Sequence, residues 1–283
     1  MKTANYHQRI IDYYEESENA YKDAWDLGKS FAIHFGYWDE SVHSFRQSLT
    51  KMNEVMAIAA RVKPGERVLD AGCGVGGSSI FLAGWAGCRV TGITLSERQK
   101  EQAIQNANLK KVNSLVDFRV MDYCATDFPD KSFDVVWGCE SICYAEDKVK
   151  FIKEAYRLLR PGGRLVVADG FVTKFENNDH PVLRQWLDGW QVNYLETIER
   201  FCVFMKQEGF SDILFKDIST YTASSSVRLY RYYFLASFYV WWKKITSSRR
   251  FSDIQKKNIK ACKFQYIGLS KKLWQYGLVV GEK

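Results

Sequence analysis

The sequence has none of the features expected of a secreted, disulfide-rich or repeat protein. No two of its seven cysteines stand in the C-x-x-C spacing and their number is odd, so neither a disulfide framework nor a cysteine metal site is predicted. The first twenty residues mix acidic and polar side chains and lack the apolar core of a signal peptide. We therefore expect a cytoplasmic protein with reduced thiols and no bound metal.

An aromatic stretch late in the sequence is too short to cross a bilayer. It holds 11 residues, 232–242, between Arg231 and Lys243, whereas a membrane-spanning helix needs about 20. We predict that this stretch covers a ligand pocket. The alternative is that it lies on a membrane surface while a substrate enters, which would be a peripheral contact without stable insertion.

Charge of one sign is only mildly in excess. There are 40 basic and 33 acidic residues, a formal charge of +7, and much of the excess lies after residue 228. Such a charge balance is compatible with binding to a nucleic acid, to an anionic small molecule or to a membrane surface. It is equally compatible with a basic face that contacts only solvent. No nucleic-acid-binding motif accompanies it, so no nucleic-acid partner is expected.

Short apolar runs alternate with helical periods in the middle of the sequence. The runs predict strands at residues 67–71, 89–96, 116–122, 133–141 and 164–171. Strands that alternate with helices form right-handed β-α-β units. The pattern therefore predicts an α/β fold with a doubly wound sheet of about seven mainly parallel strands.

The flanking regions have different patterns, and we divide the chain accordingly. Residues 1–60 predict N-terminal helices that form a lid, with Ser41 as a helix N-cap, and residues 61–172 predict the ligand-binding core. Residues 173–283 predict an aromatic-rich helical cap, inserted before a last strand that completes the core sheet.

The segment "VLDAGCGVGGSS", residues 68–79, places four glycines within six residues. It follows the first predicted strand and opens a helix, where backbone N–H groups and the helix dipole favour an anionic or polar ligand. Its spacing departs from the dinucleotide fingerprint G-x-G-x-x-G. By itself the loop is compatible with binding of a nicotinamide cofactor and with a purely structural turn.

Four segments in a fixed order indicate which ligand the glycine loop binds. They are "VLDAGCGVGG", "VTGITLSERQ", "VMDYCATDFPDKSFDVVW" and "RLLRPGGRLVVAD". Together they resemble the class I S-adenosylmethionine-dependent methyltransferases. The resemblance covers residues 60–172 strongly. It implies a Rossmann-like fold, methyl transfer and S-adenosyl-L-methionine as the cofactor.

The resemblance also implies roles for individual residues at the cofactor. Gly72 and Gly74 would let the backbone lie against the methionine part, and Asp70 would hold the loop or reach the amino group. Asp122 would accept a hydrogen bond from the adenine amine, and Tyr123 would lie beside the ring.

One position departs from most of the class. The second strand ordinarily ends in an acidic residue that binds the ribose hydroxyls, but here Thr94 stands there, and Gln99 is a candidate second contact. A hydroxyl makes a weaker, uncharged hydrogen bond. The threonine resembles a subgroup that contains sterol, tocopherol and geranyl diphosphate C-methyltransferases, sarcosine-type N-methyltransferases and cyclopropane fatty-acid synthases.

The segment "GCESICY", residues 138–144, follows the fourth strand, where ligands of open α/β sheets bind. Its glutamate and tyrosine resemble the E-S/A-x-x-Y/H segment of the carbon-methylating enzymes. The resemblance implies that Glu140 faces the transferring methyl group and takes a proton, with Tyr144 beside it. The alternative is that Glu140 only ties down a neighbouring loop.

Two aromatic segments near the N-terminus are candidates for a lid that excludes water. They are residues 12–16 and 34–38, and both resemble N-terminal segments of the same subgroup. Tyr13 or Tyr14 is expected to close over the cofactor. His34 is a candidate second acid or base, against the alternative of a structural histidine.

The sequence therefore predicts methyl transfer to a hydrophobic small molecule, most simply to a carbon of a prenyl, terpenoid or related natural-product acceptor. The aromatic cap suits the carbocation that forms when an alkene is methylated. An O- or N-methyltransferase of a phenol or amine is the alternative. An RNA methyltransferase, a non-enzymatic cofactor-binding scaffold and a nicotinamide dehydrogenase fit the motifs less well, and a homo-oligomer is left open.

Overall fold

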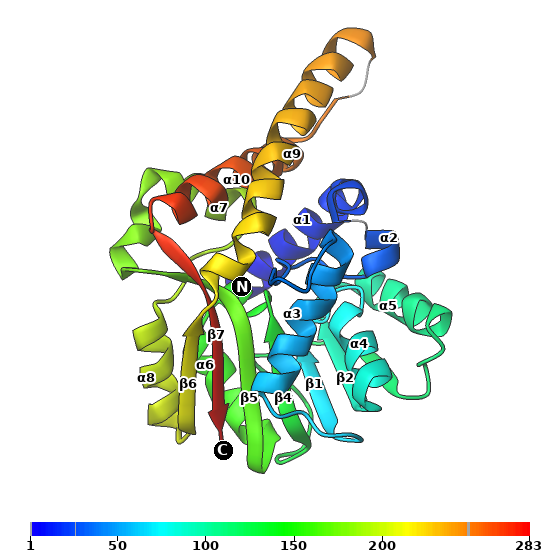
Figure 1. The fold of residues 1–283 in the computed structure, drawn as a ribbon, viewed down its shortest axis with the longest axis vertical. Helices are drawn as coiled ribbons and strands as arrows, with labels where there is room; N and C mark the ends of the chain where they lie inside the picture. Colours follow the sequence, from blue (N-terminus) through cyan, green and yellow to red (C-terminus); the bar gives the residue numbers. More distant parts are fainter. Residues whose placement is uncertain (1, 26, 248–249) are drawn as a thin grey trace.

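A single seven-stranded sheet organises the protein. The computed structural model describes residues 2–25, 27–247 and 250–283, and its sheet has the order β3-β2-β1-β4-β5-β7-β6 (Figure 1). The neighbours from β3 to β5 are parallel, whereas β7 runs antiparallel between β5 and β6. The predicted α/β fold with a doubly wound, mainly parallel sheet is confirmed.

The strands lie close to the predicted positions. They are β1 (Arg67–Ala71), β2 (Arg89–Thr94), β3 (Val116–Val120), β4 (Phe133–Cys139), β5 (Leu159–Val172), β6 (Ser211–Asp217) and β7 (Trp274–Glu282). The fifth strand starts earlier than predicted because Leu159 already pairs with Phe133 of β4, with a shift of register before Arg164 pairs with Val135.

Helices precede, connect and follow the strands. They are α1 (Lys2–Trp25), α2 (Leu27–Ser30), α3 (Phe45–Ala59), α4 (Gly77–Ala86), α5 (Glu97–Leu109), α6 (Lys148–Leu158), α7 (Pro181–Gly189), α8 (Ile198–Glu208), α9 (Ser219–Thr246) and α10 (Asp253–Ser270), with short 3-10 turns η1 (Ile142–Tyr144) and η2 (Phe175–Asp179).

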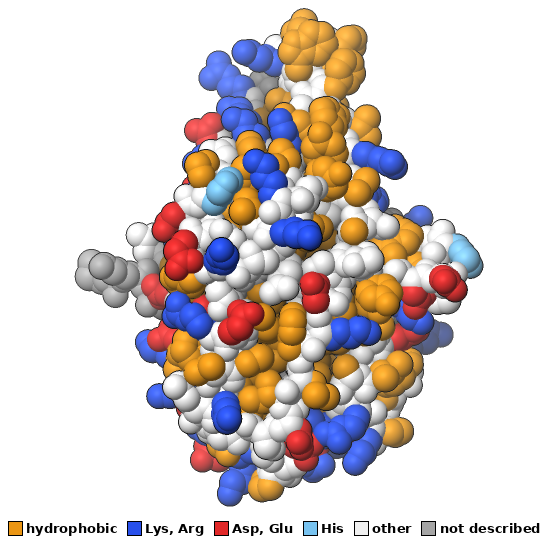
Figure 2. Space-filling view, turned by 60° about the vertical axis from the view of Figure 1, so that its left-hand side comes forward, with side chains coloured by type: hydrophobic (Ala, Val, Ile, Leu, Met, Phe, Trp, Pro, Cys, Tyr) orange, Lys and Arg blue, Asp and Glu red, His pale blue; other side chains and the backbone are white. Residues whose placement is uncertain are grey.

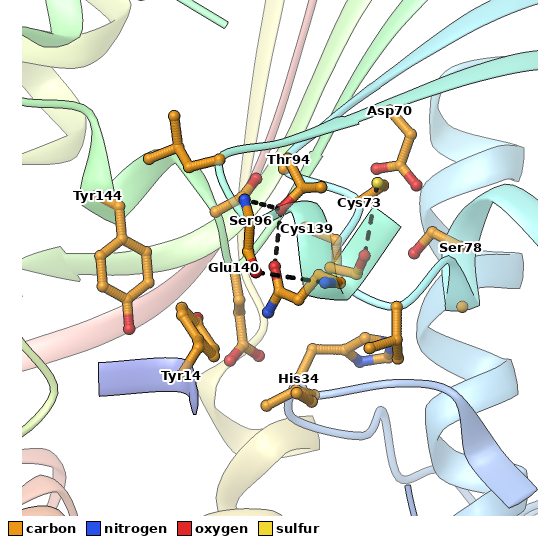
Figure 3. Close-up of a pocket in the computed structure, with 18 of the residues that line it drawn as sticks. Tyr14, His34, Asp70, Cys73, Ser78, Thr94, Ser96, Cys139, Glu140 and Tyr144 are labelled. Carbon is orange, nitrogen blue, oxygen red and sulfur yellow. Dashed lines mark hydrogen bonds between the residues drawn. The ribbon is translucent and has the colours of Figure 1, made fainter. Parts of the chain in front are cut away.

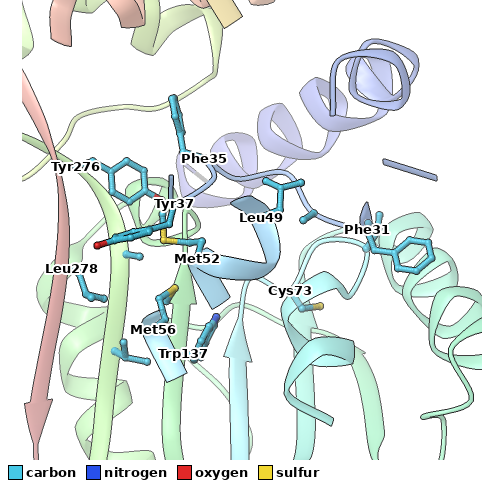
Figure 4. Packing of buried hydrophobic residues seen from close by; sticks show 14 of the residues in the cluster. Phe31, Phe35, Tyr37, Leu49, Met52, Met56, Cys73, Trp137, Tyr276 and Leu278 are labelled. Atoms are coloured by element: carbon cyan, nitrogen blue, oxygen red, sulfur yellow. The ribbon is translucent and has the colours of Figure 1, made fainter. Parts of the chain in front are cut away.

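Alternating strand residues build a core on each face of the sheet. Val68 of β1 packs in the cluster that contains Met52 and Met56 of α3, which Figure 4 shows against Trp137 of β4. Its neighbour Leu69 packs in the opposite cluster, with residues of α6 and α8. Successive side chains of a strand point to opposite faces, so these buried runs require helices on both sides.

Helices α1, α7, α9 and α10 gather beyond the carboxyl ends of the parallel strands (Figure 1). This is the end at which open α/β sheets bind ligands. The glycine loop after β1 and the segment after β4 therefore open toward these helices.

Two local features of the flanking regions differ from what the sequence predicted. The third helix begins at Phe45 because Ser44, not Ser41, caps it by accepting a hydrogen bond from Gln47 N–H. Helix α10 was not predicted, although Ser252 and Gln255 form a capping box, a signal that the sequence carries.

The predicted pocket cover at residues 232–242 is wrong. This stretch forms the outer half of α9, which projects beyond the rest of the molecule in Figure 1. Its large side chains, among them Leu235, Phe238 and Trp241, are exposed to solvent. An 11-residue apolar run does not by itself predict whether the helix that contains it packs over the pocket or extends into solvent.

The other expectations about cysteines, metals and membranes can be compared with the structure. All seven cysteines are free thiols. Over the described ranges no group of three or more metal-ligating side chains occurs, and no helix has the length and apolarity to cross a membrane.

A buried ion pair connects β5 with the segment between α3 and β1. The Arg164 guanidinium donates to both carboxylate oxygens of Glu66, at 2.9 and 2.7 Å, and to the carbonyl groups of Ala60 and Arg61. Burial raises the pKa of Glu66, but the hydrogen bonds from Arg164 and from Lys63 N–H, together with the positive charges of both side chains, hold that pKa below its usual value. A depressed carboxyl pKa stabilises the fold above the ordinary pKa, and this contribution is lost as the pH falls through the lowered one.

Replacing Arg164 with methionine should destabilise the protein by about 3–5 kcal/mol, because it leaves Glu66 buried without its partner. Urea unfolding at neutral pH measures the change. The matched control is Arg61→Met, since the Arg61 side chain pairs with Glu282 at the surface and is 65% exposed. Surface pairs contribute about 0–1 kcal/mol. Equal effects of the two variants would contradict the assignment.

Candidate active site

A deep cavity lies at the carboxyl ends of β1, β2 and β4. It measures about 880 Å³, counting its open mouth. Ten of the eleven residues predicted for the site line it: Tyr14, His34, Asp70, Gly72, Gly74, Thr94, Gln99, Tyr123, Glu140 and Tyr144. Figure 3 labels Tyr14, His34, Asp70, Thr94, Glu140 and Tyr144 among them, which converge from α1, the segment after α2, and the ends of the strands.

The glycine loop forms one wall of this cavity. The N–H groups of Gly72 and Cys73 both donate to Ile93 O, which ties the loop to β2. Gly72 has a φ of 92°, and a Cβ there would lie 2.4 Å from the Ser141 Cβ, so the position requires glycine. Gly74 has a φ of 51°, and a Cβ there would meet nothing within 4 Å. A ligand can therefore lie directly against the backbone at Gly74.

Asp70 lies at the end of β1 beneath this loop. It is buried, and its carboxylate accepts a 2.6 Å hydrogen bond from the Ser79 hydroxyl at the start of α4. Burial raises the pKa of Asp70 to about 6, while the bonds from Ser79 act in the opposite direction. The side chain thus ties the loop region to α4 and lines the cavity, and its predicted contact with the amino group of the cofactor stays a prediction.

Thr94 and Gln99 lie together at the end of β2. The Thr94 hydroxyl donates to Gln99 Oε1 at 2.7 Å and accepts from Ser96 N–H (Figure 3). Because Thr94 already has both partners, Gln99 and Ser96 are as well placed as Thr94 to bind a polar ligand in the cavity.

Asp122 follows β3 but does not line the cavity, unlike its neighbours Met121 and Tyr123. Its Oδ1 accepts from Cys124 N–H at 2.8 Å, and its Oδ2 lies 3.7 Å from Nε2 of His7 in α1. The Tyr123 hydroxyl donates to Ser141 O, which fixes the ring against the wall. The adenine contact of Asp122 stays a prediction.

The Asp122→Ala variant should bind the cofactor about 1–3 kcal/mol more weakly, the usual effect of losing a hydrogen bond to a charged group. Thr94→Ala should have a smaller effect, because its lost bond is neutral. Titration calorimetry with S-adenosylhomocysteine measures both. Asp117→Ala is the control, since Asp117 lies on β3 and pairs only with exposed Arg119 in the described structure. An unchanged affinity in Asp122→Ala would move the adenine site elsewhere.

Glu140 directly follows β4 in a left-handed conformation, with a φ of 48°. Its backbone N–H donates to Ala168 O, and its Oε1 accepts from the Tyr276 hydroxyl at 2.6 Å and from Phe35 N–H. Burial raises the pKa of Glu140 to about 8, although these two hydrogen bonds lower it. A carboxyl group with a pKa near neutrality is suited to exchanging protons.

A second cavity adjoins the first at Glu140. It measures about 580 Å³ including its mouth, and the two share Tyr14, Ile33, Glu140 and Tyr144. Seven aromatic residues line the second cavity: Tyr14, Phe35, Tyr144, Trp186, Trp190, Trp274 and Tyr276. Of the described residues that line it, none is Lys, Arg or His, and the only charged types are Glu140 and Asp169.

The segment after Glu140 is held by two buried groups that the sequence did not reveal. Asp169 of β5 accepts from Cys143 N–H at 2.8 Å. The Lys148 ammonium group donates to Cys143 O and Ala145 O, and burial lowers its pKa to about 8. These contacts fix the turn that carries Tyr144 at the boundary of the cavities.

The N-terminal aromatic residues divide between core and cavity. Tyr13 is fully buried and its hydroxyl meets Asn258 of α10, whereas Tyr14 lines both cavities and packs on Tyr144, with ring centroids 5.8 Å apart. Of the two candidates, Tyr14 is therefore the one at the site.

His34 is buried in the wall of the first cavity. Burial lowers its pKa to about 4, so its ring is neutral at physiological pH. Its Nδ1–H donates to Phe35 O at 2.9 Å, and its Nε2 has no hydrogen-bond partner within the described chain. His34 thus offers a hydrogen-bond acceptor to a ligand rather than a proton.

The comparisons with known proteins agree with this arrangement. A family model described as a methyltransferase domain matches residues 69–167. The chain is 32% identical over 211 residues to the O-methyltransferase cnsE of Penicillium expansum, a match that covers 74% of each protein. The chain belongs to the S-adenosylmethionine-dependent methyltransferases. The predicted family and its cofactor, S-adenosyl-L-methionine, are confirmed.

This methyltransferase is also similar to a second enzyme in sequence and to a third in structure. It is 36% identical over 215 residues to 2-methyl-6-phytyl-1,4-hydroquinone methyltransferase of Synechocystis sp., which covers 69% of this chain and 66% of that enzyme. A structure of geranyl diphosphate methyltransferase in complex with GPP and sinefungin shares its fold, with a TM-score of 0.76 over 98% of this chain and 99% of that one, at 22% identity. The methyltransferase spans 56–66% of the length of several curated relatives that it matches.

Proposed function

We propose that this methyltransferase moves a methyl group from S-adenosyl-L-methionine to a hydrophobic small molecule, at a carbon of a prenyl, terpenoid or related natural-product acceptor. The observation that carries the proposal is the place of Glu140. Its partly buried carboxyl group, with a pKa raised to about 8, lies where a cavity walled by the glycine loop meets one walled by aromatic rings.

The first cavity has the chemistry that the cofactor needs. The open backbone at Gly74 and the unpartnered Nε2 of buried His34 leave room and an acceptor atom for a polar ligand. Gly72, Gly74 and Asp70 would hold its methionine part, and the ends of β2 and β3 its nucleoside part. When bound, the cofactor supplies an electrophilic methyl group on a sulfonium.

The second cavity suits an apolar acceptor that becomes positively charged. Its aromatic faces stabilise cations, and the carboxyl groups of Glu140 and Asp169, which also line it, add negative charge when they are ionised. It has no described basic residue that could neutralise a diphosphate. The acceptor group inside is therefore neutral or cationic.

The proposed reaction uses these groups in sequence. The π electrons of an alkene form the new carbon–carbon bond as the carbon–sulfur bond breaks, which leaves a carbocation on the acceptor. Glu140 then takes the adjacent proton, and the C–H electron pair restores the double bond. Both hydrogen bonds that hold the carboxyl fall on Oε1, so Oε2 is the atom assigned to receive the proton.

The flanking regions would close the site. Tyr14, from the predicted lid at residues 1–60, lines both cavities, and Trp186, Trp190 and Trp274, from the predicted cap at residues 173–283, line the second. We assign these regions to water exclusion and acceptor binding, because methyl transfer depends on holding the reacting atoms at near-attack distance.

N-methylation of a hydrophobic amine is the second candidate. The combination of aromatic rings with the carboxyl groups of Glu140 and Asp169 favours it, since aromatic faces stabilise the positive charge of an ammonium group. In that reaction Glu140 would accept the amine proton.

Incubation with deuteromethyl cofactor and a panel of prenyl compounds tests the proposal. The panel contains matched chains that end in a hydrocarbon, an alcohol, an amine and a diphosphate, and mass spectrometry locates the label. Label on a chain carbon of the neutral compounds is expected, and label on nitrogen alone would establish the second candidate. Preference for the diphosphate over its matched alcohol would overturn the proposed acceptor class.

A further inference from the structure

The outer half of α9 exposes large apolar side chains on one helical face. Phe234, Phe238, Trp241 and Ile245 follow the i, i+4, i+7, i+11 spacing of a single face, and all are more than half exposed. Trp242 borders the same face. We refer to residues 234–245 as the α9 tip. Figure 2 shows hydrophobic side chains gathered at the projecting end of the molecule, with Lys and Arg side chains beside them.

The sequence on either side of the α9 tip carries charge of one sign. The sequence has no acidic residue between Asp217 and Asp253, but it has six basic ones in this interval: Arg228, Arg231, Lys243, Lys244, Arg249 and Arg250. Helical spacing places Lys244 beside the apolar face and Lys243 nearly opposite to it, over the Tyr239 ring. An apolar face on a helix that otherwise carries only basic charges is complementary to the surface of a bilayer that contains anionic lipids.

The α9 tip lies at the same end of the molecule as the active site. Helix α9 rises from the carboxyl-end side of the sheet, and α10 returns from the tip and packs against α7 (Figure 1). Helix α7 carries Trp186, which lines the second cavity. A surface that receives the tip would therefore face the end of the protein that binds the acceptor.

We propose that the α9 tip docks this methyltransferase on an anionic lipid bilayer, with its apolar face in the interfacial layer and its lysines at the lipid headgroups. Tryptophan and phenylalanine are suited to this layer, since aromatic side chains concentrate at membrane interfaces. The docking is peripheral, in keeping with the described helices, none of which can span a bilayer.

A second copy of the chain fits the α9 tip less well. In a symmetric dimer the same patch contacts itself, so the basic residues of two tips would be brought together without acidic partners. An anionic lipid surface supplies those partners. The proposal does not rest on the proposed acceptor or on methyl transfer, because binding to lipid requires neither.

Flotation of the full chain with lipid vesicles tests the proposal. The vesicles contain phosphatidylcholine alone or equal amounts of phosphatidylcholine and phosphatidylglycerol. We expect the wild-type protein to bind the anionic vesicles at least about tenfold more tightly than the neutral ones, and added salt to weaken the binding. Failure to float with anionic vesicles would overturn the proposal.

Two variants of the tip and one control distinguish docking through the tip from non-specific adsorption of exposed apolar side chains to lipid. Phe238→Ser with Trp241→Ser removes the apolar face, and Lys243→Glu with Lys244→Glu reverses the charge; each should weaken binding by about tenfold or more. The control is Ile58→Ser with Leu109→Ser, two side chains that are 68% and 72% exposed outside the tip. It should bind as the wild type does.

Thermal unfolding confirms that each variant is folded, and light scattering after gel filtration gives its mass. Undiminished vesicle binding by both tip variants would contradict the proposal. A wild-type dimer that the serine variant dissociates, without vesicle binding by either protein, would assign the tip to a second copy instead. Cofactor-dependent stabilisation should be the same in all variants, so failure of the docking proposal is separate from failure of the proposed function.

Discussion

Replacing Glu140 with glutamine should lower turnover by about 10²–10⁴-fold, the usual contribution of a general base, and leave cofactor affinity nearly unchanged. Glutamine keeps the size of the side chain, and its carbonyl oxygen can still accept from Tyr276 and Phe35 N–H. It cannot accept a proton. The measurement is single-turnover methyl transfer at saturating cofactor, with the acceptor found in the panel above.

The pH dependence of the same reaction gives an independent readout. A base must be ionised to act, and burial raises the pKa of Glu140 to about 8, so the wild-type rate should rise as the pH increases through about 8. The glutamine variant should lack this rise. Glu146→Gln is the matched control, because Glu146 lies in the same segment but is exposed. It should retain both rate and profile.

Near wild-type turnover in Glu140→Gln would exclude the base. The side chain would then act by positioning, and Glu140→Ala should lower stability and cofactor affinity because Phe35 N–H and the Tyr276 hydroxyl lose their acceptor. Membership of the methyltransferase family does not depend on this outcome.

Gly74→Val should abolish the rise in melting temperature that S-adenosylmethionine or S-adenosylhomocysteine produces in the wild type. A ligand that binds only the native state stabilises it, so the shift in melting temperature reports affinity. At Gly74 a side chain would enter space that no other protein atom fills within 4 Å. Gly74 lines the first cavity, the proposed site of the cofactor.

Backbone strain has to be separated from this steric effect. The φ of 51° at Gly74 costs a side-chain-bearing residue about 1–2 kcal/mol. Gly65 is the control, since it has a φ of 76° and an equally open Cβ position but does not line the cavity. Gly65→Val should lose stability and keep the cofactor shift. A cofactor shift that persists in folded Gly74→Val would remove the glycine loop from the site.

The core sheet and the first cavity were predictable because their signals are local. Alternating strands and helices specify parallel β-α-β units, and Gly72, Gly74 and Thr94 stand directly at the ends of strands. The carboxyl ends of neighbouring parallel strands meet, so order along the chain predicts proximity in space.

The partners of the reacting group were not predictable in this way. Tyr276 lies 136 residues from Glu140 along the chain, and the Phe35 contact is made by a backbone N–H that any residue could supply. Lys148 and Asp169 are ordinary charged residues in sequence, and only burial gives them their role. The aromatic run at 232–242 was misassigned because composition does not tell which way a helix points.

The position of β7 has a consequence for how the protein is made. This strand, near the end of the sequence, fills the place between β5 and β6, and it carries Tyr276, which holds Glu140. Until the ribosome has synthesised residues 274–282, β5 and β6 each have an unpaired edge, and such edges promote aggregation. The nascent chain should therefore depend on chaperones until late in translation, and a protein that stops before residue 274 should be insoluble rather than merely inactive.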